Sequence, residues 1–361
     1  MWDRTADTMT ATTATSSRSL DEKRSELDTI LRAMGRVLIG YSGGVDSAML
    51  AVAAHRVLGD EAIAVTADSA SYASGELEAA SEIMRQFGIR HEVVHTRELD
   101  NPDYAKNASN RCYFCKQELF THMQRLAGEF DANYILYGQN ADDVGDFRPG
   151  AQAAKDHGVR APLQEAGLSK ADVRELARRW DLSVWDRPAM ACLSSRFPYG
   201  TPVTAASLRM VDRAEKYLKD RGFTQLRMRH HTDIARLELP PKDLVRCLAD
   251  ADLRRPLVRQ CTSIGYAQVV LDLRGFRSGS MNEALLPIAV DQAEMPGRIG
   301  RSLEAHDCVP HAFERREQML CLRLASSAFN LLADHTSRQG LVESLENLGL
   351  LYIALDLDPL D

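Results

Sequence analysis

The feature that most constrains this chain is a short glycine-rich stretch between a buried strand and a helix. The apolar run 37–41 predicts a strand, and the apolar spacing of 46–57 predicts a helix. Between them lies the sequence Ser42-Gly43-Gly44-Val45-Asp46-Ser47. Glycine allows positive φ and close approach of the backbone to a ligand. Successive N–H groups at the start of a helix then bind an anion. The stretch therefore predicts a phosphate loop in an α/β fold.

The side chains of this loop suit a nucleoside triphosphate. Ser42 and Ser47 supply hydroxyl donors, and the carboxylate of Asp46 suits Mg²⁺ held between phosphates. No lysine follows the glycines, so the loop is not a Walker A motif. An ordinary glycine turn capped by serine or aspartate remains the alternative. We expect ATP and Mg²⁺ as cofactors, bound by Ser42, Gly43, Gly44, Val45, Asp46 and Ser47.

Strand and helix patterns alternate after the loop. Further strands are predicted at 62–66, 91–95, 134–137 and 182–185, and helices at 75–87, 116–127 and 170–180. This alternation predicts a parallel sheet covered on both faces, with ligands at the carboxyl ends of its strands. Residues at two such ends are therefore candidates for nucleotide binding, namely Ala67, Gly138, Gln139 and Asp142. For Asp142, capping of the next segment is the alternative.

The length of the chain and its loop-forming residues indicate how it is divided into domains. A length of 361 residues suggests two domains. We expect a disordered leader at 1–20, a phosphate-loop domain at 21–190 and a smaller α+β domain at 191–286. The segment 287–361 shows only helix-like patterns, such as 316–333, and its role is open. No internal repeat is apparent.

Charge and hydropathy narrow the function classes. The net charge of −7 argues against a large nucleic-acid surface, so no nucleic-acid partner is expected. No apolar run approaches the ~18 residues of a membrane span. The first 20 residues lack the apolar middle of a signal peptide. A cytoplasmic location without membrane association is therefore expected.

Three of the seven cysteines form a pattern. An odd number without a secretion signal does not indicate a disulfide framework. Cys112 and Cys115 precede a predicted helix, and Cys192 lies in the junction between the domains, so all three can reach one crevice. A helix N-terminus with Arg111 and Lys116 nearby favours the thiolate, which attacks electrophiles and binds soft metals. The alternatives are a zinc half-site, a redox dithiol or buried small residues. The other four, Cys247, Cys261, Cys308 and Cys321, show no pairing pattern.

A basic pair marks the smaller domain. Arg227 and Arg229 alternate on a predicted strand, so both point to one face. Two guanidinium groups on one face suit a phosphate monoester, and a solvated charged face is the alternative. His230 and His231 are adjacent and face opposite sides, so we do not expect them to be metal ligands.

The loop Ser42–Ser47 resembles that of the PP-loop ATP pyrophosphatases, which have an adenine nucleotide alpha hydrolase-like, Rossmann-like fold and split ATP between its α and β phosphates. From Arg36 to about Glu283 the chain resembles the LarE family, the sulfur transferases that make the nickel-pincer cofactor of lactate racemase. The matching segments are 42–47, 110–116, 138–142, 191–196, 227–231, 235–238 and 277–283.

The resemblance implies a reaction and its residues. ATP adenylates a carboxylate of a pyridinium dicarboxylate mononucleotide, and sulfur then converts it to a thiocarboxylate. Cys192, Asp46 and Ser47 are the implied catalytic residues, with Asp46 also holding Mg²⁺. The implied substrate-binding residues are Lys116, Arg196, Arg227, Arg229, Glu238 and Arg277.

The sulfur supply and the partners are also implied by the resemblance. Cys112, Cys115 and Cys192 are expected to hold a [4Fe-4S] cluster whose free iron carries added sulfide. In the alternative, Cys192 gives up its own sulfur and becomes dehydroalanine. The implied partners are the mononucleotide, a sulfide or sulfur donor, a nickel-insertion protein that takes the product, and further copies in a homo-oligomer.

Three other functions fit parts of the pattern. A PP-loop tRNA thiolase would need a broad basic surface. A non-catalytic adenine-nucleotide sensor would not need a thiol. An amide-forming relative, such as an NAD or GMP synthetase, would use ammonia and would not need the three cysteines.

Overall fold

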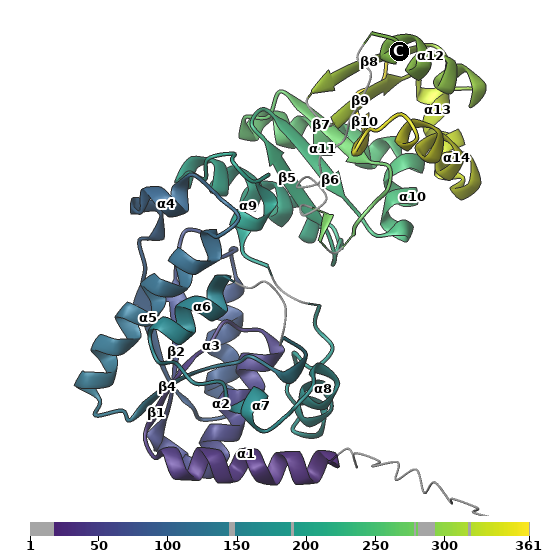
Figure 1. Ribbon diagram of the computed structural model, residues 1–361. Coiled ribbons are helices and arrows are strands. Elements are labelled where there is room, and N and C mark those ends of the chain that lie inside the picture. The colour runs from purple at the N-terminus through teal and green to yellow at the C-terminus, as the bar shows by residue number, and fades with distance from the viewer. Residues whose placement is uncertain are drawn as a thin grey trace, which may run out of the picture.

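The computed structural model describes residues 18–143, 149–188, 191–277, 279–280, 293–316 and 319–360. It contains two sheets, one of four strands and one of six. Each sheet belongs to its own domain, and the two domains are joined at the carboxyl end of the first sheet (Figure 1). The predicted leader 1–20 lies mostly outside the described residues. Across the described residues, no helix is long and apolar enough to cross a membrane.

The first sheet is entirely parallel, as the sequence predicts. Its strands are β1 (Val37–Gly40), β2 (Ala62–Asp68), β3 (Arg90–His95) and β4 (Tyr134–Tyr137), in the order β3-β2-β1-β4. Because β1 is central and parallel to both neighbours, its end and the following loop lie in the middle of the carboxyl edge.

Helices cover both faces of this sheet, which confirms the predicted α/β class. One core joins the strands to α1, α2, α3 and α8, and another joins them to α5 and α6. Helix α2 is buried along most of its length, as expected for a helix that is apolar all round. The helices are α1 (Leu20–Met34), α2 (Val45–Leu58), α3 (Glu76–Gln86), α4 (Pro102–Ala105), α5 (Arg111–Glu129), α6 (Pro149–Asp156), α7 (Pro162–Glu165) and α8 (Lys170–Arg179).

The strand predicted at 182–185 is wrong. These residues form consecutive turns, with the N–H of Leu182 bonded to Ala177 and that of Trp185 to Leu182. Leu182 and Val184 are buried against the helices, which explains the apolar pattern. Among the described residues, the sheet continues beyond β4 only as a bridge from Leu136 to Arg160.

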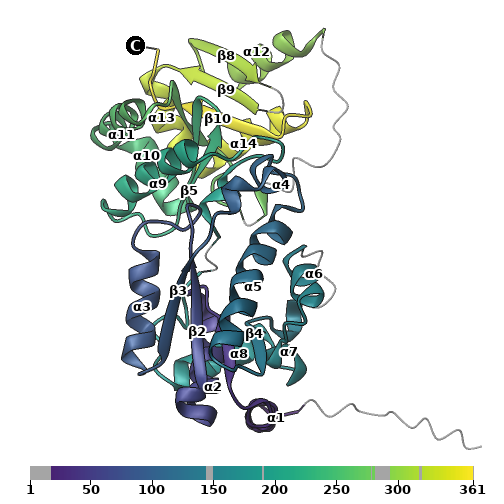
Figure 2. The same ribbon diagram turned by 90° about the vertical axis from the view of Figure 1, so that its left-hand side faces the viewer.

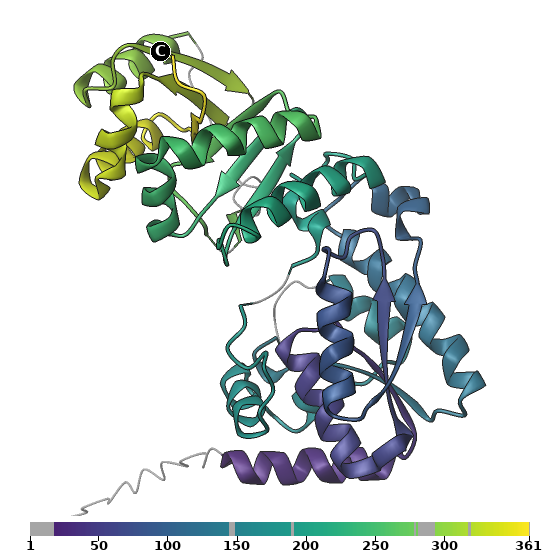
Figure 3. The same cartoon turned by 180° about the vertical axis from the view of Figure 1, so that it is seen from behind.

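The second domain carries the six-stranded sheet, in the order β5-β6-β7-β10-β9-β8. Seen from behind, its green helices cross in front of the strands (Figure 3). Its elements are α9 (Ala205–Lys219), β5 (Arg227–His231), β6 (Ile234–Glu238), α10 (Pro241–Ala249), α11 (Ala251–Ile264), β7 (Gln268–Asp272), α12 (Met295–Ala305), β8 (His311–Arg316), β9 (Met319–Leu324), α13 (Ser326–Ala333), α14 (His335–Glu346) and β10 (Tyr352–Asp356).

The expectation of only helix-like segments after 287 is wrong. Three strands from this part, β8, β9 and β10, join the sheet of the preceding residues across the predicted boundary at 286. The predicted helix 316–333 is instead the strand β9 followed by the short helix α13. A short continuous apolar run such as 319–322 fits a buried strand and a buried helix equally well by periodicity.

The two faces of this sheet differ in chemistry. Met228, Leu237 and Leu271 point into the core shared with the helices. The alternate positions Arg229, Arg236 and Glu238 point to the opposite face, because side chains along a strand alternate. The strand period thus places charged groups together on one side of β5 and β6.

The junction between the domains is built from several short segments. The N–H of Val203 bonds to the carbonyl of Ala105 at the end of α4, which reaches toward the second domain (Figure 2). Ser74, just before α3, donates from its backbone to the carboxylate of Asp212 in α9 at 2.9 Å. These contacts fix the second domain over the carboxyl edge of the first sheet.

Candidate active site

Two cavities open at the carboxyl edge of the first sheet. One, of about 650 Å³, is lined by the phosphate loop, Gly138, Gln139 and Lys116. The other, of about 560 Å³, is lined by Ala67 and by Cys112, Cys115 and Cys192. Both cavities are bounded by Gly40, Ser42, Cys112 and Lys116. Most of the predicted nucleotide-binding residues therefore share one crevice with the three thiols, whereas Gly43, Val45 and Asp142 line neither cavity.

Hydrogen bonds between residues of the phosphate loop fix its shape. Gly43 has φ +76°, a conformation that favours glycine. Ser47 is buried, and its hydroxyl accepts from the N–H of Ser42 and donates to the carbonyl of Gly44, both at 3.1 Å. Gly44 is the N-cap of helix α2 and offers no capping side chain, which leaves the first N–H groups of the helix to an anion. Ser47 thus acts on the shape of the loop as well as lining the cavity.

Gly138 lets the end of β4 cross the first turn of α2. A Cβ on Gly138 would lie 2.6 Å from the backbone nitrogen and 2.8 Å from the Cα of Ser47. Both neighbouring atoms belong to the backbone, so they cannot swing aside. Only glycine fits here, which gives a physical reason for a glycine at this predicted position.

Asp46 is held by two partners. Asn140 donates to one carboxylate oxygen at 3.1 Å, and Lys170 forms an ion pair with the other. The sequence analysis missed Lys170, whose only local signal is its place at the start of a helix, after the capping Ser169. Asp142 accepts a hydrogen bond from the backbone N–H of Lys170, the first residue of α8, at 2.8 Å. This contact corresponds to the alternative of capping the next segment. The Asp46 carboxylate faces the loop cavity, and one such oxygen ligand beside phosphates suits Mg²⁺.

Cys112 and Cys115 lie in the first turns of α5, which begins at Arg111 and thus earlier than predicted. Burial, with Cys192 nearby, raises the pKa of Cys115 to about 12. Removal of water, with Cys192 nearby, also raises the pKa of Cys112. The expectation that the helix start and Lys116 favour both thiolates is therefore wrong for these free thiols, because burial outweighs the positive charges. Binding to a metal cation would reverse this, since a coordinating thiol loses its proton.

The three thiols fit an iron–sulfur cluster in the kind of ligand they offer. Fe–S clusters are held by cysteine thiolates, and Cys112, Cys115 and Cys192 line one cavity. Their positions in this structure are not those of a formed metal site. Within the described ranges, no three His, Cys, Asp or Glu side chains are gathered so that they could hold a metal ion.

The loop that carries Cys192 is anchored by both domains. From the first domain, the hydroxyls of Tyr104 and Ser194 bond at 2.7 Å, and Arg111 donates to the Ser194 carbonyl at 2.8 Å. From the second, Arg196 donates to the Cys192 carbonyl at 2.8 Å and pairs with the buried Glu215 at 2.8 Å. Arg196, predicted to bind substrate, is thus engaged in holding the Cys192 loop.

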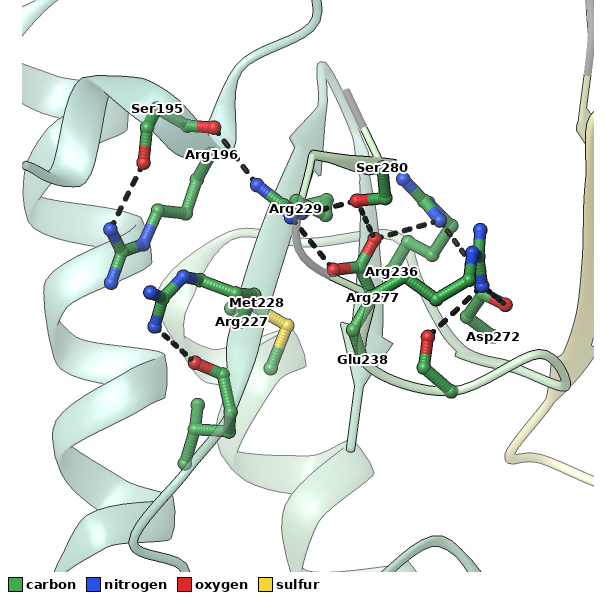
Figure 4. A network of polar contacts seen from close by, with 12 residues as sticks. Ser195, Arg196, Arg227, Met228, Arg229, Arg236, Glu238, Asp272, Arg277 and Ser280 are labelled. Atoms are coloured by element: carbon green, nitrogen blue, oxygen red, sulfur yellow. Dashed lines mark hydrogen bonds and ion pairs between the residues drawn. The ribbon is translucent and has the colours of Figure 1, made fainter. Parts of the chain in front are cut away.

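Three other predicted substrate residues belong to a network of ion pairs (Figure 4). Arg229 donates to Glu238 at 2.8 Å and to the carbonyl of Ser195 at 2.9 Å. Arg236 lies 3.1 Å from Glu238 and also pairs with Asp272, which Arg277 approaches at 3.5 Å. Arg229 therefore connects the second sheet to the loop that follows Cys192, and Glu238 and Arg277 belong to the charged network beside it.

Arg227 opens into a third cavity, of about 570 Å³, whose lining also includes Arg196. Burial and the neighbouring Arg196 lower the pKa of Arg227 to about 10. The sequence analysis did not single out two further cations of the lining, Arg187 and Lys219. The lining includes one carboxylate, Glu76, beside these basic groups. Such a surplus of positive charge suits an anion such as a phosphate.

The anion cavity adjoins the thiol cavity. Glu76 and Ala191 line both of them, and Ala191 directly precedes Cys192. A ligand with its phosphate near Arg227 can therefore extend toward Cys192 and the phosphate loop.

Comparisons with known proteins identify relatives of this chain. Residues 23–116 match the NAD synthase family model. An uncharacterized protein of Synechocystis sp. is 45% identical over 266 residues, which are 74% of this chain and 99% of that protein. Pyridinium-3,5-bisthiocarboxylic acid mononucleotide synthase of Lactiplantibacillus plantarum is 36% identical over 268 residues, 74% of this chain and 96% of that protein. A glutamine-hydrolyzing GMP synthase chain of Archaeoglobus fulgidus is 27% identical over 212 residues, 52% of this chain and 65% of that protein.

The parallel sheet and its phosphate loop define a PP-loop protein of the ATP-using kind. The likeness to GMP synthase and to the NAD synthase model covers little more than half of the chain at most. The likeness to the mononucleotide synthase spans nearly that whole protein. The chain belongs to the LarE family.

We predict that Gly138→Ala weakens ATP binding. The added methyl group must displace backbone at Ser47, so we expect the Kd for ATP to rise by at least about tenfold, or about 1.4 kcal/mol, in calorimetric titrations. Gly128→Ala is the matched control, because a Cβ on this exposed glycine of α5 meets no atom within 4 Å. Equal ATP affinity and equal melting temperature of the two variants would contradict the close approach.

Proposed function

We propose that this chain is an ATP-dependent sulfur transferase that acts on a pyridinium dicarboxylate mononucleotide. One observation carries the proposal: the phosphate loop and Cys192 line cavities that share a wall, and the arginine cavity adjoins the thiols. The activity in the name of the Lactiplantibacillus relative, a bisthiocarboxylic acid mononucleotide synthase, supports this choice of substrate.

The proposed reaction has two steps. In the first, a carboxylate oxygen of the substrate attacks the α-phosphorus of ATP, the bond to the β-phosphate oxygen breaks, and pyrophosphate leaves. In the second, a sulfur nucleophile attacks the carbonyl carbon of the acyl adenylate, a C–S bond forms, and the C–O bond to AMP breaks. The carboxylate becomes a thiocarboxylate, and AMP is released.

The residues of the crevice have distinct roles in this scheme. The N–H groups at the start of α2 bind the phosphates, and Asp46 would hold Mg²⁺, which supplies positive charge for the leaving pyrophosphate. Lys116 lines both cavities and is placed to neutralise charge between them. Arg227, with Arg187 and Lys219, binds the substrate phosphate, which orients the carboxylate toward the loop.

Cys192 takes part in both proposed routes of sulfur supply. A cluster held by Cys112, Cys115 and Cys192 would have an iron without a protein ligand, where added sulfide can bind. The alternative is that Cys192 donates its own sulfur, which would consume the protein. The presence of three thiols around one cavity favours the cluster. A sulfur donor and a downstream nickel-insertion protein are the proposed partners.

The other candidate functions have less support. An amide-forming synthetase accounts for the phosphate loop but not for the thiols beside it. A tRNA thiolase is disfavoured by the net charge of −7 and by a basic cavity of about 570 Å³, a size suited to a small molecule. A nucleotide sensor leaves the anchored Cys192 loop without a role.

The proposal is tested with protein purified without oxygen, MgATP and the dicarboxylate mononucleotide. We expect AMP, pyrophosphate and a product in which sulfur replaces carboxylate oxygen, detected by mass spectrometry. We also expect about four irons per chain and an unchanged protein mass. Cys192→Ala should abolish the thiocarboxylate, whereas Cys308→Ala, buried elsewhere in the second domain, should not.

Two results would count against this account. Loss of one H₂S from the protein mass at Cys192, without iron, would replace the cluster by the sacrificial route. Full thiocarboxylate formation by the Cys192→Ala variant would refute the role of this thiol altogether.

We predict that Arg227→Gln weakens substrate binding and spares ATP binding. Loss of a charged hydrogen-bond donor to phosphate should raise the KM for the mononucleotide by about 10–100-fold, or about 1.4–3 kcal/mol. The KM for ATP should change by less than about twofold, because the loop is untouched. Arg221→Gln, at an exposed arginine stacked on Tyr217, is the control. A rise in KM for ATP equal to that for the mononucleotide would contradict the assignment.

A further inference from the structure

The second domain consists of the same succession of elements twice. Its first part runs α9-β5-β6-α10-α11-β7, and its second part runs α12-β8-β9-α13-α14-β10. Both parts read helix, strand, strand, helix, helix, strand. In each, an antiparallel pair of strands is followed by a parallel third strand, β7 beside β6 and β10 beside β9.

The sequences of the two parts also correspond. Ten of the 26 residues from Leu248 to Leu273 are identical to the residue 84 positions later, between Leu332 and Leu357. The shared pattern is Leu-Ala-Asp, then Arg, Leu-Val, Gly and Leu-Asp-Leu. The expectation of no internal repeat is therefore wrong. The signal was missed because the first halves of the two parts have diverged.

A shared arginine makes equivalent hydrogen bonds in both parts. Arg254 in α11 donates to the carbonyls of Cys247 and Leu248 at the end of α10. Its counterpart Arg338 in α14 donates to the carbonyls of Leu332 and Ala333 at the end of α13. Each arginine is buried and closes the end of the preceding helix.

The hydrogen-bond register shows that a pseudo-twofold axis relates the two parts. Leu271 of β7 lies directly opposite its own counterpart, Leu355 of β10. On either side of this pair, Asp272 faces Ala354 and Val270 faces Asp356. Because Asp356 is the counterpart of Asp272 and Ala354 is the counterpart of Val270, the two pairs are equivalent. The β6–β7 and β9–β10 registers also match position for position. This is the geometry of a symmetric dimer interface, made within one chain.

The second part has not kept the charged groups of the first. By register, the counterparts of Arg227 and Arg229 are Ala312 and Glu314. The counterparts of Arg236 and Glu238 are Cys321 and Arg323. The residue matching Arg227, which opens into the anion cavity, is thus an alanine, so the second part has no equivalent anion site at this strand.

The second part instead contributes to the network of the first. The guanidinium carbon of Arg236 lies over the ring of Tyr352 in β10, 3.9 Å from the centre of the ring. The hydroxyl of Tyr352 donates to the carbonyl of Ser280 at 3.2 Å, and the Ser280 hydroxyl contacts both Arg229 and Glu238. β10 therefore supports the arginines that hold the loop after Cys192.

We propose that residues 294–360 are a duplicated copy of the unit 205–273 that has lost its anion-binding arginine and serves as a built-in partner. It occupies the place that a second subunit would take against β7. Without it, β7 would be an open sheet edge, and an open edge pairs with another chain. In this chain the edge is closed internally, so the protein does not self-associate through β7. This inference does not depend on the proposed reaction.

Cysteine substitution on the symmetry axis tests the proposal. Opposite residues of a hydrogen-bonded antiparallel pair have Cα atoms about 5.5 Å apart, within the range of a disulfide. We expect the full-length double variant Leu271→Cys/Leu355→Cys, oxidised with copper phenanthroline, to form a disulfide within one chain. The intact mass should fall by two hydrogens, and the protein should stay monomeric on a non-reducing gel.

The single variant Leu271→Cys separates the two arrangements. If β7 paired with β7 of another copy in the same register, residue 271 would face itself, and the single variant would give covalent dimers. We expect no dimers beyond those of the unaltered chain, which controls for its seven native cysteines. Covalent dimers of either variant, or a double variant without any disulfide, would overturn the proposal.

Hydrogen exchange on the unaltered chain tests the pairing of β7 with β10 without any substitution. The N–H of Leu273 bonds to the Ile353 carbonyl, and that of Leu357 to the Val269 carbonyl, both at 2.9 Å. We expect protection of peptides containing β7 and β10 to be equal at protein concentrations about hundredfold apart, because pairing within a chain does not depend on concentration. Protection of β7 that is absent, or is lost on dilution, would overturn the proposal.

Discussion

The anchoring of the Cys192 loop between the two domains is the interaction on which the rest of the site depends. Tyr104 and Arg111 hold it from the first domain, and the buried pair of Arg196 and Glu215 holds it from the second. Removing one partner of a buried ion pair costs about 3–5 kcal/mol, because the other charge is left buried alone. The position of the thiol relative to the phosphate loop is therefore set by folding, before any ligand binds.

This anchoring also explains why few of the predicted arginines face a ligand. Arg196 and Arg229 make most of their contacts with the protein, and they fix the loop on either side of Cys192. Arg227 remains directed at a cavity, where its charge is poorly compensated. Arg229 thus positions the loop and Arg227 faces the cavity, whereas Arg196 does both. The C-terminal copy extends the same division, since Tyr352 supports the network from a part of the chain without an anion site of its own.

The sequence predicted the first domain well because its signals are local. The loop Ser42–Ser47, the glycine at 138 and the alternation of strands and helices each depend on neighbouring residues. The family also followed from such short motifs. The failures have a different origin. Lys170 lies 124 residues from Asp46, so their ion pair shows in no local pattern. The strands β9 and β10 are buried and largely apolar, and their assignment needed the neighbouring strand β7. The internal repeat is visible only when the two halves are aligned at the spacing that the sheet reveals.

The central claim is that carboxylate activation and sulfur transfer are separate events in one crevice, the first made by the phosphate loop and the second by the thiols. Trapping with hydroxylamine tests this most directly, in the variant Cys112→Ala/Cys115→Ala/Cys192→Ala with MgATP and the dicarboxylate mononucleotide. The account predicts AMP, pyrophosphate and a substrate hydroxamate without any thiocarboxylate, because the acyl adenylate forms and no sulfur follows. A folded triple variant that releases no AMP and yields no hydroxamate would contradict it, since the thiols would then be needed for activation itself.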